Sequence, residues 1–148
     1  MYKLTKLCFI TLSGLFLSVS GLSADSADMC SEQMLRAYFP ASFVTKTLEK
    51  FQVPKDQMTA IIAELTLKDK DVIPTFEKRA TEKNPNLLRD PKYREEGAKL
   101  FRSILTETFS EVLKNHGITD ADKVSQMLDD IQEQKAEQFS KCMPQNES

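Results

Sequence analysis

The most constraining feature of the sequence is the spacing of its apolar residues, which recur at helical intervals along most of the chain. The longest run covers about six helical turns and consists of Tyr93, Gly97, Leu100, Phe101, Ile104, Leu105, Phe109, Val112 and Leu113. A period near 3.6 residues predicts a helix with one buried face. Only four of the 148 residues are glycine, so few positions favour the tight turns that join strands. The sequence therefore predicts an all-α fold.

Residues 1–24 have the pattern of a cleaved secretory signal peptide. Lys3 and Lys6 precede an apolar run over residues 7–17, and small residues follow. This order is typical of an export signal, with an uncleaved N-terminal anchor as the alternative. We expect residues 25–148 to form a single helical domain with a short disordered C-terminal tail. Nothing after residue 24 is apolar enough over a sufficient length to span a bilayer.

Two cysteines, Cys30 and Cys142, remain after removal of the signal, which contains Cys8. They bracket almost the whole of the remaining chain, and an exported protein folds where disulfides persist. We therefore predict one disulfide that joins the two ends of the domain. Free thiols or an intermolecular bridge are the alternatives. An even number of helices that alternate in direction would bring the two cysteines to the same end of the bundle.

Prolines separate the first three predicted helices. A short helix covers about residues 30–39 and ends at Pro40, and a second helix ends before Pro54. Because proline is tolerated in the first turn of a helix, Pro54 is well placed to open a third. The polar joint 68–71 follows this third helix.

The fourth helix has the weakest pattern. Asp71 is its expected N-cap, and its inner residues are expected to be Ile73, Phe76 and Ala80. The segment 84–86 then predicts a turn.

The last two helices have clear start and stop signals. Asp90 and Pro91 predict the start of the fifth helix, and Gly117 is the expected glycine after its end. Thr119 and Asp122 resemble a capping box for the sixth helix. One face of that helix carries Val124, Leu128, Ile131, Phe139 and Cys142, with Lys135 as the polar exception. The sequence thus predicts about six helices in one small bundle, held by an N-to-C disulfide.

The composition disfavours several classes of function. The full chain has 20 basic and 22 acidic residues, whereas nucleic-acid binding requires a surplus of Lys and Arg. His116 is the only histidine, so a site with two histidine ligands cannot form. It lies at the predicted end of the fifth helix, where histidine commonly interacts with the helix dipole. The sequence contains no phosphate-binding or dinucleotide motif, so no cofactor is expected.

The acidic residues form two weak candidate sites. Asp129, Glu133 and Glu137 are spaced to form a row on the last helix, most simply as a solvated face. The segment 69–71 begins like a calcium loop, but Pro74 and Ala80 replace the glycine and glutamate that such a loop needs. We therefore assign no catalytic or metal-binding residue.

The region before and after Pro40 is the best candidate for a binding surface. Met34, Tyr38, Phe39 and Phe43 concentrate flexible and aromatic side chains there, close to Met29, and such side chains suit adaptable recognition. The sequence therefore predicts an exported, non-enzymatic binding protein, periplasmic or secreted, whose partner is a protein or an apolar ligand. Its expected architecture resembles the small disulfide-containing acid-stress chaperones of the periplasm, without a shared motif. The alternatives are a carrier of a lipid or other apolar ligand between helices, and a secreted enzyme or effector that uses the acidic row.

Overall fold

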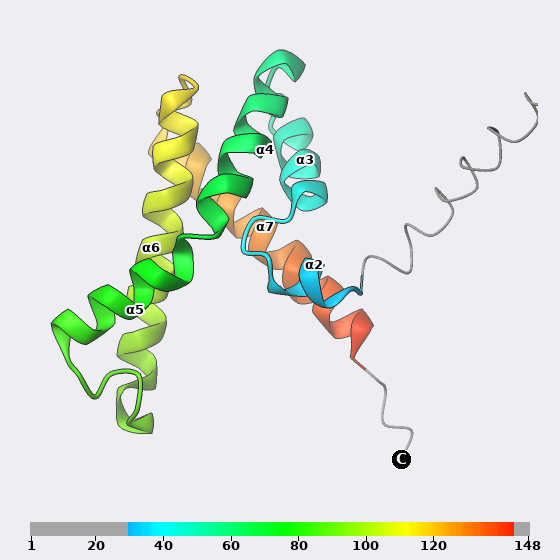
Figure 1. Cartoon of the computed structure of the whole chain (residues 1–148). Helices are drawn as coiled ribbons and strands as arrows, with labels where there is room; N and C mark the ends of the chain where they lie inside the picture. Colours follow the sequence, from blue (N-terminus) through cyan, green and yellow to red (C-terminus); the bar gives the residue numbers. More distant parts are fainter. Residues whose placement is uncertain (1–29, 144–148) are drawn as a thin grey trace, which may run out of the picture.

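The computed structural model describes residues 30–143, apart from the side chains of Glu32 and Gln33, and this part of the chain is helical without strands (Figure 1). The elements are α2 (Glu32–Arg36), α3 (Ala41–Lys50), α4 (Lys55–Asp69), α5 (Val72–Lys83), the 3₁₀ turn η2 (Pro91–Tyr93), α6 (Arg94–Asn115) and α7 (Ala121–Cys142). The predicted all-α fold with six helices and an N-to-C disulfide is confirmed for these residues. The predicted signal peptide, Met29 and nearly all of the predicted tail lie outside the described residues.

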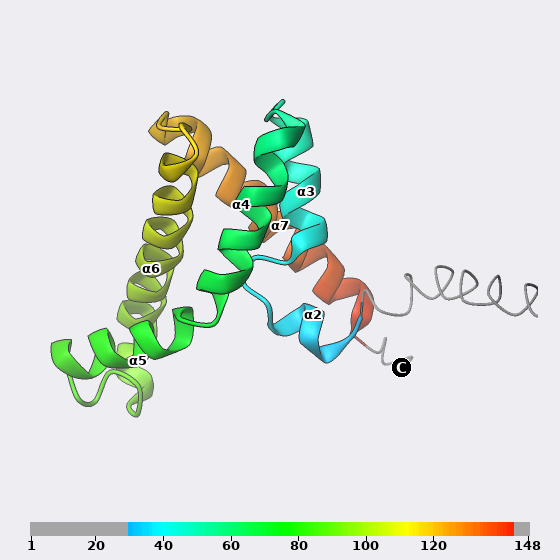
Figure 2. The same ribbon diagram turned by 45° about the horizontal axis from the view of Figure 1, so that its top comes forward.

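Helix α6 packs against three other helices, α4, α5 and α7. Helix α3 packs against α4 and α7. Two views show that α5 and the first half of α6 project together at one side, whereas α2 lies beside the last turns of α7 at the other (Figures 1 and 2). We call residues 72–102 the α5–α6 arm. The two ends of the molecule therefore offer separate surfaces.

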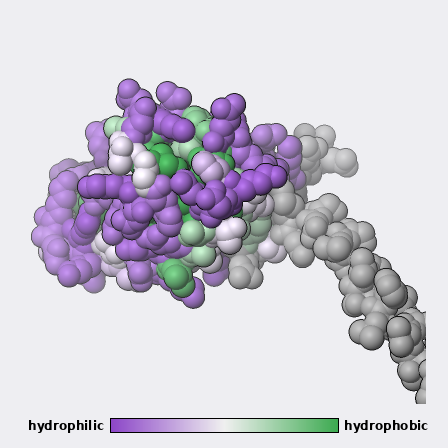
Figure 3. Space-filling view, turned by 90° about the horizontal axis from the view of Figure 1, so that it is seen from above, coloured by the Kyte–Doolittle hydropathy of each residue, from purple (hydrophilic) through white to green (hydrophobic). Residues whose placement is uncertain are grey.

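The core lies where α3, α4, α6 and α7 meet. Its most deeply buried side chains are Val44, Leu48, Ile61, Leu65, Phe109, Val112, Leu113, Met127 and Ile131. These residues follow helical spacing within each helix, as the sequence predicts. Seen from above, the surface is mainly hydrophilic with small hydrophobic areas (Figure 3). The apolar stripe of α7 continues past this core, and Phe139 near its end is 52% exposed.

A polar cluster joins α3 to α7 within the core. Thr47 is fully buried, and its hydroxyl donates a hydrogen bond to Asp130 Oδ2 at 2.6 Å. Gln134 Nε2 donates to Thr47 Oγ1 at 2.8 Å and to Asp130 Oδ2 at 3.0 Å, while Lys50 pairs with Asp130 Oδ1. We call these four residues the Asp130 cluster. It fixes the position of α7 along α3 because the hydrogen bonds are directional.

The start of α5 differs from the sequence prediction. Helix α4 continues through Asp69, so the joint is only two residues long. Asp71 is the N-cap of α5, as predicted, but its side chain makes no cap hydrogen bond. As a result the inner stripe of α5 begins one residue earlier, with Val72 buried and Ile73 39% exposed. The expected inward position of Ile73 is therefore wrong, and the stripe runs through Val72, Phe76 and Ala80.

The predicted end of the fifth helix is confirmed. Gly117 has a φ of +80°, a conformation that glycine adopts without steric cost. Its N–H donates to Lys114 O at 3.0 Å, and Ile118 N–H donates to Leu113 O at 2.9 Å. These two bonds are those of a Schellman motif, and Ile118 packs against the core as expected.

The start of the sixth helix requires a correction. Asp120, rather than Thr119, is the N-cap of α7, and its carboxylate accepts hydrogen bonds from the backbone N–H groups of Asp122 and Lys123 at 3.0 and 3.1 Å. The cap is one residue later than predicted because the carboxylate of Asp120 reaches two of the four unpaired N–H groups of the first turn. At the preceding helix, Asp90 accepts a hydrogen bond from the N–H of Lys92 at 2.9 Å, as expected of a cap, but it caps the 3₁₀ turn η2, and the α-helix itself begins later than predicted, at Arg94.

Candidate functional site

The short helix α2 is held in place by contacts at both ends of its segment. Cys30 forms a disulfide with Cys142, 112 residues away in the sequence, with their Cα atoms 5.5 Å apart. At the other end, Asp69 Oδ1 accepts hydrogen bonds from the backbone N–H groups of Tyr38 at 2.7 Å and Phe39 at 2.8 Å. A helix of five residues is not stable alone, so these two attachments determine where α2 lies.

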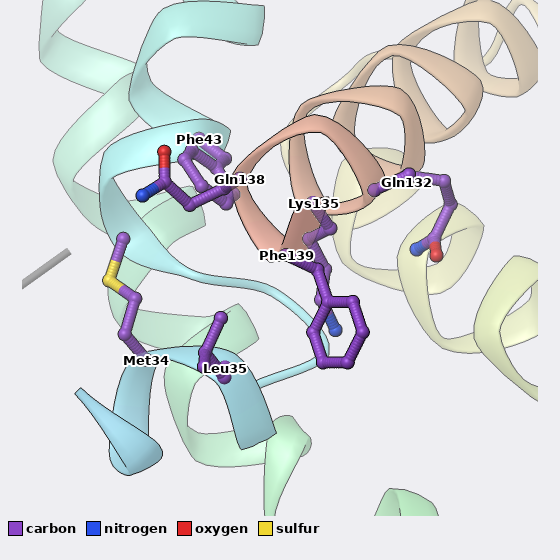
Figure 4. Close-up of a pocket in the computed structure, with 8 residues that line it drawn as sticks. Met34, Leu35, Phe43, Gln132, Lys135, Gln138 and Phe139 are labelled. Carbon is purple, nitrogen blue, oxygen red and sulfur yellow. The ribbon is translucent and has the colours of Figure 1, made fainter. Parts of the chain in front are cut away.

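A groove of about 360 Å³ lies between α2 and α7 (Figure 4). It is lined by Met34 and Leu35 from α2, Phe43 from α3, and Gln132, Lys135, Ala136, Gln138 and Phe139 from α7. We call this site the α2–α7 groove. Its position depends on the disulfide, because the bond joins the segment containing α2 to the last residue of α7.

The walls of the groove combine apolar side chains with polar groups. Met34 and Leu35 are half-buried, and the exposed ring of Phe139 lies on the α7 side (Figure 4). The Nε2 atom of Gln132 is buried and has no hydrogen-bond partner within residues 30–143. A buried donor without a partner is costly. The groove is therefore suited mainly to an apolar group.

Lys135 forms the polar part of the groove closest to the aromatic residues. Burial lowers the pKa of Lys135, and the carboxylate of Asp69 partly opposes that shift. Its Nζ lies 5.2 Å from the centroid of the Tyr38 ring, within the range of a cation–π contact. Burial also raises the pKa of Tyr38, as does Asp69. Tyr38 in turn packs edge-on against Phe101 at 5.2 Å, so the groove adjoins the α5–α6 arm.

The structure separates the four residues of the predicted binding surface. Met34 and Phe43 line the α2–α7 groove, although Phe43 is mostly buried. Phe39 belongs to the core and stacks against Phe109 with ring centroids 5.9 Å apart. Tyr38 contacts Phe101 and Lys135 instead. The four side chains therefore do not form one continuous surface.

The residues that sequence reasoning missed come mainly from α7. Leu35, Gln132 and Phe139 line the groove together with Met34. The sequence carried one signal for a groove on the last helix. The apolar stripe of that helix continues to Phe139, beyond the length that a compact core needs, and Lys135 interrupts the stripe with a polar side chain. Such a stripe can serve a binding site as well as a core.

The acidic row on α7 is a surface feature. Asp129 pairs with Arg102 at 2.7 Å and Glu137 pairs with Lys141 at 2.7 Å, all with exposed side chains. Glu133 is also exposed. Lys141 lowers the pKa of Glu137 by a hydrogen bond and by its charge. No group of three or more His, Cys, Asp or Glu residues in the described chain is arranged to hold a metal ion.

His116 lies directly after α6, as predicted, and it also links two helices. Its Nε2 lies 2.9 Å from Glu64 Oε2 of α4, while Asn115 Nδ2 donates to Glu64 Oε1 at 2.8 Å. Hydrogen bonds from Asn115 and His116 lower the pKa of Glu64. This contact fixes the end of α6 against α4.

The comparisons with known proteins give no further guidance. No family model matches the chain, and no curated protein or solved structure is significantly similar to it. Within residues 30–143, none of the helices is both long and apolar enough to cross a membrane. The function is therefore inferred from the geometry.

Proposed function

We propose that the protein is an exported, non-enzymatic binding protein that holds an apolar segment of a partner protein in the α2–α7 groove. The observation that carries this proposal is the exposed ring of Phe139 beside Met34 and Leu35 in the walls of that groove. Exposing a large aromatic side chain is unfavourable, and an exposed apolar site with polar neighbours is characteristic of an interaction surface. Aromatic residues are also enriched among those that dominate binding energy.

The disulfide supports both the mode of binding and the compartment. Because α2 is held by Cys30–Cys142, the groove exists before a partner arrives, and preorganisation reduces the entropy cost of binding. Disulfides persist in oxidising compartments such as the periplasm and the extracellular space. The signal-like sequence of residues 1–24 and the disulfide together favour export.

The chemistry of the groove favours recognition of varied apolar segments. Met34 is flexible and polarisable, so it adapts to side chains of different shape. These properties suit a chaperone-like or stress-related role. The enzyme alternative has less support, because Asp129 and Glu137 of the acidic row pair with basic residues on the surface.

The proposal is tested by measuring suppression of aggregation. Chemically unfolded citrate synthase is diluted at 25 °C with the protein under non-reducing conditions, and light scattering is recorded. We expect the wild type to suppress scattering and Phe139→Ser to lose most of this effect. Leu67→Ser is the matched control, because Leu67 is 66% exposed on α4 and does not line the groove. Both substitutions remove an exposed side chain, so circular dichroism should show normal folding.

Two results would contradict the proposal. If the wild type left scattering unchanged, the protein would not hold apolar segments; if both serine variants matched the wild type, the groove would not be the site. The variant Asp129→Ala/Glu133→Ala/Glu137→Ala should suppress scattering normally. Loss of suppression in this folded variant alone would favour the alternative in which the acidic row carries the function.

A further inference from the structure

A second pocket, of about 430 Å³, lies in the α5–α6 arm and shares no lining residue with the α2–α7 groove. It is bounded by α5, by the turn that leads to η2, and by the first half of α6. We call it the arm pocket. Its volume lies in the range of about 300 to 1,000 Å³ that is typical of small-molecule sites.

The base of the arm pocket is apolar. Leu87 is buried, and the rings of Phe76 and Phe101 meet edge-on at 5.2 Å. Gly97 gives α6 a close approach to the turn, because a Cβ atom at this position would lie 3.3 Å from Leu87 Cδ2. The pocket thus contains an apolar surface that is large enough for an alkyl chain.

Two arginines at the arm pocket form no ion pair with the acids of the described residues. Arg89 and Arg94 line it, and within residues 30–143 neither guanidinium forms an ion pair. Four other basic residues of the arm do form ion pairs: Arg79, Lys83, Lys99 and Arg102. Asp90 is the only acid in the lining, and its carboxylate is engaged by a backbone N–H. The lining therefore has a net positive charge.

The charge of the whole arm has the same sign. Residues 72–102 contain eight basic and five acidic residues, whereas residues 103–143 contain four basic and eight acidic residues. The arm is thus a basic region in a chain with a net charge of −2. An anion approaching the molecule is attracted to this end.

We propose that the arm pocket binds a medium-chain fatty acid. The alkyl chain would cover the apolar base formed by Phe76, Leu87 and Phe101, and the carboxylate would pair with Arg89 and Arg94. Arginine is suited to this role because its planar guanidinium binds a carboxylate through two parallel hydrogen bonds. The site is separate from the α2–α7 groove and does not depend on the function proposed for it.

Calorimetric titration with decanoate, below the concentration at which it forms micelles, tests this proposal. We expect saturable binding to the wild type and a loss of roughly tenfold or more in affinity for Arg89→Gln/Arg94→Gln, because a hydrogen bond to a charged group is lost. Lys92→Gln is the matched control: Lys92 lies in the same turn but does not line the pocket. Decanol, which has the same chain without the charge, should bind the wild type and the double variant equally.

A blocking variant tests the alkyl part separately. Ala98 lines the pocket and is exposed, so Ala98→Phe should fill the space without entering the core and should abolish decanoate binding. Circular dichroism would establish that each variant folds. The proposal is overturned if the wild type does not bind decanoate, or if decanoate binds the Arg89→Gln/Arg94→Gln and Ala98→Phe variants as tightly as it binds the wild type.

Discussion

The Asp130 cluster gives a direct test of how the fold is held together. In the variant Asp130→Ala, the buried hydroxyl of Thr47 loses its acceptor at 2.6 Å, and Gln134 loses one of its acceptors. The side chain of Asp130 is only 13% exposed, so water cannot fully replace these contacts. We therefore expect a marked loss of stability.

The size of the loss follows from the contacts. A hydrogen bond to a charged group contributes about 1.5 to 3 kcal/mol, and a buried donor without a partner costs about 1 to 3 kcal/mol. Lys50 adds little, because its side chain is 64% exposed and surface ion pairs contribute about 0 to 1 kcal/mol. Since Gln134 keeps its hydrogen bond to Thr47, part of the cluster survives. The expected decrease in the free energy of unfolding is about 2 to 4 kcal/mol.

Urea denaturation followed by circular dichroism measures this decrease. The matched control is Asp129→Ala, the neighbouring residue on α7, which forms an exposed pair with Arg102 and should cost no more than about 1 kcal/mol. The two variants remove the same group from adjacent positions, so the difference reports burial and hydrogen bonding. If Asp130→Ala were as stable as Asp129→Ala, the cluster would not stabilise the fold and our reasoning would be wrong.

The same cluster predicts a dependence on pH. Burial raises the pKa of Asp130, but the hydrogen bonds from Lys50 and Thr47 outweigh it and hold the pKa below its ordinary value. A carboxyl group with a lowered pKa stabilises the folded state above its unfolded pKa of about 3.9, and this stabilisation is lost as the pH falls through the folded pKa. The difference in stability between the wild type and Asp130→Asn should therefore shrink below about pH 4. A difference that stays constant between pH 7 and pH 3 would contradict this prediction.

Three further predictions concern the disulfide, an interhelical contact and a helix end. Reducing Cys30–Cys142, which closes a loop with a separation of 112 residues, should lower the free energy of unfolding by about 2 to 5 kcal/mol in urea titrations; free thiols in the untreated protein would argue against the bond. Because Asn115 and His116 lower the pKa of Glu64, Glu64→Gln should destabilise the protein in thermal melts at pH 7 and progressively less below about pH 4; an equal effect at both pH values would refute this. Gly117→Ala should cost about 1 kcal/mol, since alanine is strained at a φ of +80°; unchanged stability would show that this turn can relax.

Much of the fold was predictable from the sequence because the signals are local. The stripe from residue 93 to residue 113 becomes the buried face of α6, and Gly117 ends that helix with the expected hydrogen bonds. Helical periodicity and capping depend on residues within about four positions of one another. The pairing of Cys30 with Cys142 was also accessible, because they are the only two cysteines outside the predicted signal.

The candidate sites depended on contacts that the sequence does not display. Phe139 continues an apolar stripe, but its exposure follows from the extension of α7 past the core. The predicted binding surface around Pro40 also depended on a distant contact. Phe39 packs on Phe109 of α6, so it belongs to the core and not to that surface. Arg89 and Arg94 gained their significance only when the fold placed them together beside a pocket, where neither forms an ion pair within residues 30–143.

Asp69 illustrates the boundary between the two kinds of information. From the sequence it belongs to a polar joint with a superficial likeness to a calcium loop, whereas in the structure it ends α4 and binds two backbone N–H groups about 30 residues earlier in the chain. The sequence by itself determined the helices and several of their ends, because neighbouring residues specify them. It also favoured the disulfide, because only two cysteines lie outside the predicted signal. Only the tertiary structure decided which side chains face a groove, because exposure and partner choice depend on the packing of residues that are distant in the sequence.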